Sequence, residues 1–127
     1  MIINTTKAPK AIGPYSQAVE INSNLFLSGQ IPLDPATGKL VEGGIEEQTE
    51  QVMKNIGNVL SAAGYSFSDV VKSTCLLSDI SDFKKMNDVY SKYYTKDFPA
   101  RSTFQVAALP MGAKIEIETI ASKSNKF

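Results

Sequence analysis

The chain contains no histidine among its 127 residues. This absence excludes histidine-based catalytic triads, most zinc-dependent catalytic sites and the two-histidine mode of RNA cleavage. Acid–base chemistry must come instead from carboxylates, lysine, tyrosine, cysteine, the backbone or bound water. The sequence also lacks an excess of either charge, because 13 basic residues balance 13 acidic ones. This balance argues against electrostatic binding to nucleic acid or to an anionic membrane.

A single cysteine, Cys75, is present. It cannot form an internal disulfide, and the N-terminus lacks the long apolar region of a secretory signal, so we expect a cytoplasmic protein. No stretch is long enough to span a bilayer, which predicts no membrane partner. Because free cysteine is among the most buried residue types, we expect Cys75 to be a small core residue rather than a reactive thiol.

The length and ordinary composition predict one α+β domain over residues 1–127, with 43% hydrophobic and 20% charged residues. Hydrophobic periodicity separates strands from helices along this domain. The predicted strands cover residues 13–21, 25–27, 70–77, 102–109 and 114–121, and the predicted helices cover about 45–63 and 82–95. Two helices would then cover one face of a mixed sheet.

Arg101 follows Pro99 at the start of a predicted strand. One interpretation is a solvated charge or a surface salt bridge. The other is a bidentate clamp on a carboxylate, which the planar guanidinium suits better than a lysine amine does.

Glu116 and Glu118 are two residues apart in the last predicted strand, so they share one face of it. Ile115, Ile117 and Ala121 would point to the opposite face, toward the core. The two glutamates could be solvated on an exposed sheet face. Alternatively, one of them carries a proton, with its pKa raised by burial.

The spacing of these charged residues limits how they can work together. If strands 102–109 and 114–121 pair as an antiparallel hairpin around Pro110–Ala113, Arg101 lies opposite residue 122 and about 20 Å from Glu116. One small substrate could not touch both residues within a single chain. Either the site is assembled between chains, or Glu116 or Glu118 serves elsewhere in the protein. We favour the site assembled between chains as a hypothesis.

Three further positions have two interpretations each. Asn87 lies on or beside the apolar stripe of the second helix, where its amide would either bond to a loop or face a ligand. Tyr15 is either a core or interface aromatic or a ligand contact. Gly29, after Ser28, would mark a bulge or a close approach by a ligand or another chain, to which its backbone could offer an N–H or C=O group.

The order and spacing of these features resemble those of the Rid family, also called YjgF or endoribonuclease L-PSP, and in particular its RidA-like branch. The motifs that carry the resemblance are Gly13-Pro14-Tyr15-Ser16-Gln17, Ser28-Gly29-Gln30-Ile31-Pro32, Asn87, Pro99-Ala100-Arg101-Ser102 and Ile115-Glu116-Ile117-Glu118. The resemblance implies a chorismate-mutase-like fold in a homotrimer, with three clefts between neighbouring subunits.

The same resemblance implies an activity. This is the hydrolysis of 2-imino acids, chiefly 2-iminobutanoate and 2-iminopropanoate, to 2-oxo acids and ammonia, without a cofactor or a metal. Pyridoxal-phosphate dehydratases acting on threonine and serine would supply these imines. The alternatives are a trimer that binds 2-oxo acids without turnover, in a regulatory or chaperone-like role, and an endoribonuclease.

Residue roles also follow from the resemblance, position by position. Arg101 would grip the substrate carboxylate, and Glu116 would hold the attacking water or carry its proton. The residues implied to line the cleft are Tyr15, Ser28, Gly29 and Asn87. Thr103 stands where this branch commonly has cysteine, so no thiol chemistry is assigned there. Its contribution would be a hydroxyl or a backbone contact.

Overall fold

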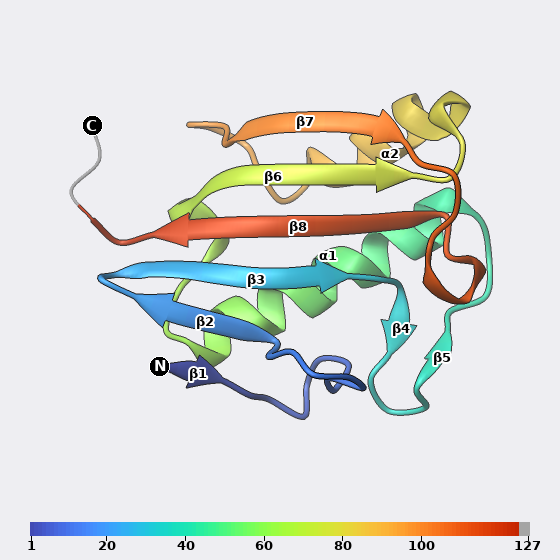
Figure 1. The fold of residues 1–127 in the computed structure, drawn as a ribbon. Helices are drawn as coiled ribbons and strands as arrows, with labels where there is room; N and C mark the ends of the chain where they lie inside the picture. The colour runs from blue at the N-terminus through green and yellow to red at the C-terminus, as the bar shows by residue number, and fades with distance from the viewer. Residues whose placement is uncertain (125–127) are drawn as a thin grey trace.

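Two α-helices cover one face of a six-stranded mixed sheet (Figure 1). The computed structural model describes residues 1–124. In the order in which they lie side by side, the strands are β1 (Ile2–Ile3), β2 (Ala18–Ile21), β3 (Asn24–Gln30), β8 (Ile115–Ser122), β6 (Val70–Leu77) and β7 (Ala100–Gln105). A separate hairpin pairs β4 (Leu33–Asp34) with β5 (Lys39–Leu40). The predicted α+β class is confirmed.

The first helix, α1 (Ile45–Ala62), begins at the predicted residue and ends just before Gly64, whose φ of +80° is in the left-handed region that favours glycine. The second helix, α2 (Phe83–Tyr90), is shorter than the predicted 82–95. Tyr93 and Tyr94 lie within the predicted helix range, but in the structure they follow α2 and pack against Phe67, with ring centroids 5.1 and 5.5 Å away. The helical spacing of these two tyrosines therefore reflects aromatic packing on Phe67 and not a longer helix.

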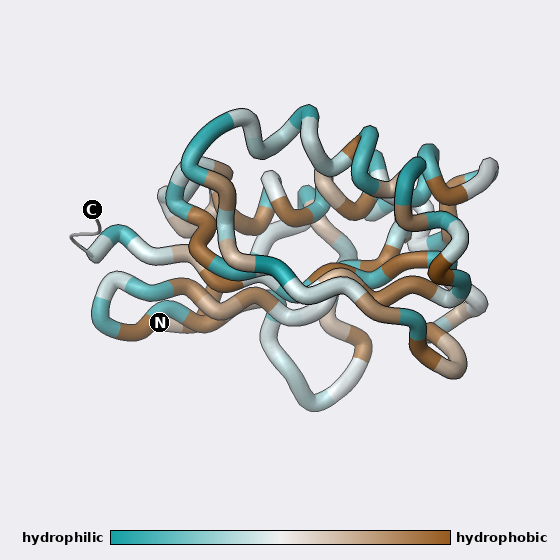
Figure 2. Tube along the Cα trace, turned by 90° about the horizontal axis from the view of Figure 1, so that it is seen from above, coloured by the Kyte–Doolittle hydropathy of each residue, from teal (hydrophilic) through white to brown (hydrophobic). Residues whose placement is uncertain are grey.

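The core lies between the two layers. Figure 2 shows hydrophobic residues on the turns of the helices that face the sheet and hydrophilic residues on their outer turns. The fully buried side chains include Val52, Met53 and Ile56 from α1 and Leu25, Ile115 and Ile117 from the sheet. Neither helix within residues 1–124 has both the length and the hydropathy needed to cross a membrane.

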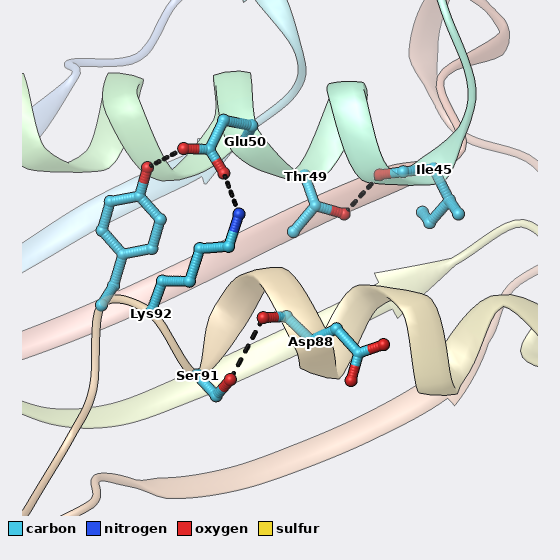
Figure 3. A network of polar contacts seen from close by, with 7 residues as sticks. Ile45, Thr49, Glu50, Asp88, Ser91 and Lys92 are labelled. Carbon is cyan, nitrogen blue, oxygen red and sulfur yellow. Dashed lines mark hydrogen bonds and ion pairs between the residues drawn. The ribbon is translucent and has the colours of Figure 1, made fainter.

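The segment that follows α2 is attached to α1 by polar contacts (Figure 3). The Tyr93 hydroxyl donates a hydrogen bond of 2.7 Å to Glu50, and the Lys92 amine lies 3.9 Å from the other carboxylate oxygen of Glu50. Burial and the bond to Glu50 raise the pKa of Tyr93. These contacts hold the chain on its way from α2 to β7.

The predicted hairpin between strands 102–109 and 114–121 is wrong. Strand β7 pairs in parallel with β6, and β8 pairs antiparallel with the other edge of β6. The strand ends at Gln105, so residues 106–114 form a connection long enough to pass β6, and this connection contains the 3₁₀ turn Pro110–Gly112. A tight turn would force β8 to pair with β7, but a connection of this length allows β8 to pair with β6 instead.

The N-terminal strands differ less from the prediction. Strand β2 starts at Ala18 rather than residue 13, because the preceding residues form a loop. A tight turn joins β2 to β3, with Asn22 and Ser23 both in the left-handed conformation at φ 51° and 63°. A two-residue turn of this kind matches the twist of the strands that it joins.

Candidate functional site

Arg101, the only arginine of the chain, lies on the edge strand β7 with its guanidinium against α2. Its Nη1 donates a hydrogen bond of 2.7 Å to Asn87 Oδ1. Its guanidinium carbon is 4.9 Å from the centre of the Tyr90 ring and 5.5 Å from that of Phe83. The faces of aromatic rings attract a cation. No carboxylate forms an ion pair with Arg101 within residues 1–124, so its charge is available to an anion.

The three residues that hold Arg101 come from one face of α2. Phe83, Asn87 and Tyr90 follow one another at four- and three-residue steps, which brings them together on a helix. Of the two interpretations of Asn87, the bond to a loop is not the contact observed, because its amide oxygen accepts from Arg101 on β7. The ligand-facing role stays a prediction. Phe83 and Tyr90 were not predicted to contact Arg101, although their spacing from Asn87 is the sequence signal that marks them.

Thr103 lies two residues after Arg101, on the same face of β7, and its neighbour on β6 is Cys75. Cys75 is fully buried, as expected. Burial raises the pKa of the Cys75 thiol to about 11, although the charge of Arg101 and the hydroxyl of Thr103 act in the opposite direction. A thiol with this pKa is protonated at neutral pH and unreactive.

A cavity of about 370 Å³ opens beside Arg101. Polar groups come from Asn87, Ser91 and Arg101. The remaining wall is formed by Tyr90, Tyr94, Phe98 and Pro99. Phe98 is 70% exposed, which is unusual for so large an apolar side chain. The cavity therefore combines one cation with an aromatic wall.

A second and larger cavity, of about 570 Å³, contains four of the predicted site residues. They are Tyr15, Ser28, Gly29 and Glu116. The Glu116 carboxyl is half-buried on the face of β8 that the helices leave open. Burial, and then the charge of Glu118, raises the pKa of Glu116 above that of an ordinary glutamate. Such a carboxyl exchanges protons more readily near neutral pH than an exposed one does.

The other residues of this cavity shape its wall. Ser28 donates its hydroxyl to the Ser16 carbonyl and its N–H to the Gln17 carbonyl, so both groups are used within the chain. Tyr15 is 51% exposed along the wall. Gln17, which was not predicted as a site residue, is 3% exposed and bonds to the backbone of Thr5 and Pro9. The buried Gln17 amide thus fixes the N-terminal segment against the cavity.

The two cavities cannot serve one small molecule within a single chain. Across the sheet, Arg101 aligns with Ser73 and then with Thr119, three residues along β8 from Glu116. Two strand spacings and three residues of rise separate the two backbones by roughly 14 Å. The side chains also differ in direction, since Arg101 packs on α2 and Glu116 lies on the open face. The separation of about 20 Å expected from a hairpin was therefore wrong, like the pairing behind it, but Arg101 and Glu116 still do not meet within one chain.

Comparison with known proteins identifies the family. The family model described as Endoribonuclease L-PSP matches residues 5–123. The chain belongs to this family. A relative from Bos taurus named 2-iminobutanoate/2-iminopropanoate deaminase is 56% identical over 120 residues, which are 94% of this chain and 88% of the relative.

Solved structures of the family share the fold. A putative endoribonuclease from Thermotoga maritima has a TM-score of 0.96 and 51% identity, with 98% of each chain covered. E. coli TdcF, solved with bound serine, has a TM-score of 0.93 and 41% identity, covering 98% of this chain and 99% of the other. The resemblance inferred from the motifs is confirmed.

Proposed function

We propose that this protein hydrolyses 2-imino acids, chiefly 2-iminobutanoate and 2-iminopropanoate, to 2-oxo acids and ammonia. The observation that carries the proposal is the state of Arg101, a partly buried cation held by Asn87 and two rings and without a carboxylate partner in residues 1–124. A 2-imino acid presents a carboxylate next to its C=N bond, and a guanidinium binds a carboxylate through two parallel hydrogen bonds. The name of the Bos taurus relative and the serine bound to TdcF support small carboxylate substrates of this kind.

The active form would be a homotrimer, with Arg101 of one subunit facing Glu116 of its neighbour. Arg101 and Glu116 lie too far apart, and on opposite faces of the sheet, to meet within one chain. The open face of the sheet also exposes large apolar side chains, including Phe26 at 47% and Phe104 at 48%. Apolar groups gathered on one face are typical of a subunit interface. Both observations support clefts between subunits.

The chemistry needs orientation more than a strong nucleophile, because a protonated imine is a good electrophile. Arg101 would fix the carboxylate, and Glu116 would accept a proton as the water oxygen bonds to the imine carbon. Glu116 would return that proton to the nitrogen and would then take the proton of the new hydroxyl group. As that happens the C–N bond breaks and the C=O bond forms, so that ammonia and a 2-oxo acid leave. Tyr15, Ser28, Gly29 and Thr103 would line the cleft.

The proposal also concerns where the substrate comes from. Pyridoxal-phosphate dehydratases that act on threonine and serine would release the imines in the cytoplasm. The hydrolysis itself would need no cofactor, since water supplies the oxygen atom and both hydrogen atoms that the products gain, and Glu116 only carries protons between them.

A coupled assay tests the proposal. A threonine dehydratase generates 2-iminobutanoate in place, semicarbazide competes for it, and semicarbazone formation is followed. We expect the wild-type protein to suppress semicarbazone formation. We expect Arg101→Ala to lose about 30- to 160-fold of this activity, which corresponds to about two to three kcal/mol of charge-assisted hydrogen bonding. Lys39→Ala, which removes an exposed cation on β5, is the matched control and should behave as wild type.

Two results would contradict the proposal. If neither protein affects semicarbazone formation, but wild type binds a 2-oxo acid and Arg101→Ala does not, the cleft is a binding site without turnover. If RNA is cleaved with a steep dependence on salt, the endoribonuclease alternative takes its place.

A further inference from the structure

Strand β3 has an irregularity at Ser28 and Gly29, next to the proposed catalytic carboxyl. Leu27 pairs with Thr119 of β8 and Gln30 pairs with Ile117. Two residues of β3 therefore lie opposite one residue of β8, which is the arrangement of a β-bulge. Bulges redirect side chains and are common beside functional sites.

Gly29 is in contact with the Glu116 side chain. A Cβ atom added at Gly29 would overlap Glu116 Oε2 and would lie 2.9 Å from its Cδ and 3.1 Å from its Cγ. All three of its nearest neighbours would thus belong to Glu116. Gly29 does not have a positive φ, so alanine can adopt its backbone conformation without strain. Space, rather than backbone conformation, explains a glycine at this position.

The Glu116 carboxyl has no other anchor in the part of the chain that the structure describes. No hydrogen bond or ion pair from its side chain is formed within residues 1–124. It lies half-buried against the bare backbone of β3, with Glu118 as the nearest charge acting on it. The space available beside the β3 backbone, and not a polar partner, therefore determines the position of the Glu116 carboxyl.

We propose that Gly29 is a positioning residue for Glu116, because its missing side chain leaves the space in which the Glu116 carboxyl lies. This inference rests on the proposed function only for the role of Glu116. It differs from a role of the Gly29 backbone in substrate binding, because alanine keeps the backbone N–H and C=O groups and changes only the space.

The first test is a double-mutant cycle. We expect Gly29→Ala to lower kcat about 100-fold, the effect of displacing a catalytic group by about 1 Å. KM should change little, because Arg101 is untouched. In a Glu116→Gln background, Gly29→Ala should have no further effect. An equal loss in both backgrounds would overturn the proposal.

The matched control is Gly44→Ala, another glycine beside a glutamate. Gly44 has a φ of −97°, and a Cβ added there would lie at an ordinary 3.8 Å from Glu47 Oε1. We expect this variant to keep the wild-type kcat. If Gly29→Ala folds poorly, adding Glu116→Ala removes the overlapping carboxyl and should restore the thermal midpoint; a midpoint that stays low would overturn the proposal.

A titration separates this inference from the proposed function. In Gly29→Ala the Glu116 carboxyl must move outward, so its pKa, followed by carbon NMR of labelled glutamate, should fall toward the ordinary value. An unchanged pKa would overturn the role of Gly29. If wild type hydrolyses no imine, the proposed function fails, and the titration still decides whether Gly29 positions Glu116.

Discussion

The Arg101 side and the Glu116 side of the proposed cleft are built in opposite ways. Arg101 is held by contacts, because one face of α2 provides Asn87 Oδ1, which accepts a hydrogen bond from the guanidinium, and two aromatic rings. Glu116 is positioned sterically, because the bulge and the missing side chain of Gly29 leave room on the sheet for its carboxyl. The difference shows that a charge can be positioned either by partners or by the absence of a side chain.

The two sides also share a property. Each ionisable group is partly removed from water without an opposite charge beside it in residues 1–124. For Arg101 the ring faces offset part of the lost hydration. For Glu116 burial is uncompensated, and its pKa rises. A bound substrate therefore stabilises both charged groups, because it supplies an anion to Arg101 and a proton donor to Glu116.

The largest expected effect comes from recombining the two sides between subunits. Arg101→Ala and Glu116→Gln should each be nearly inactive alone. In trimers assembled from an equal mixture, about a quarter of the clefts would receive both wild-type residues, and about a quarter of wild-type activity should return. The measurement is the semicarbazide assay after the mixture is unfolded and refolded together. Activity that stays at the level of the single variants would show that Arg101 and Glu116 do not share a cleft across subunits.

A smaller effect is expected at Asn87. Asn87→Ala leaves Arg101 with its two rings and should raise KM about tenfold through the lost hydrogen bond. Asn87→Asp should raise KM further, because a carboxylate 2.7 Å from the guanidinium would neutralise the charge that the substrate needs. The control is Asn58→Asp, at a side chain that bonds to the Lys7 carbonyl in another part of the protein. The same KM for Asn87→Ala and Asn87→Asp would mean that the amide only packs against Arg101.

The smallest effect concerns Glu118. Its charge is the second cause, after burial, of the raised pKa of Glu116. Glu118→Gln should therefore lower the pKa of Glu116 without restoring the ordinary value, and the acid limb of the pH–rate profile should move to lower pH. NMR titration of Glu116 gives the same quantity directly, and a pKa that rises or does not move would exclude this electrostatic coupling.

The sign of the accompanying stability change follows from linkage. Because the pKa of Glu116 is higher in the folded protein than in the unfolded chain, its contribution to stability is present at low pH. That contribution is lost as the pH rises through the folded pKa. Glu118→Gln should reduce this loss, so thermal midpoints of wild type and variant should converge in acid and separate slightly at neutral pH.

Much of the fold could be predicted from local patterns. The start of α1, the bounds of β6 and the inward face of β8 all follow from hydrophobic period, since each element buries one face against the other layer. The length of α2 could not, because Tyr93 and Tyr94 mimic a helical stripe while packing on Phe67. Hydrophobic periodicity indicates which residues are buried, but it does not indicate which element of the fold they pack against.

By itself the sequence determined the chemistry that is available: no histidine, one arginine, two carboxylates on one strand face, and motifs typical of one family. Only the tertiary structure decided which of these residues meet. Three contacts join segments that are distant in the chain: β7 pairs with β6, Asn87 of α2 accepts a hydrogen bond from Arg101, and the Glu116 side chain packs over Gly29. Such contacts are selected by the packing of the whole domain, because each one is possible only after the layers between which it lies have formed.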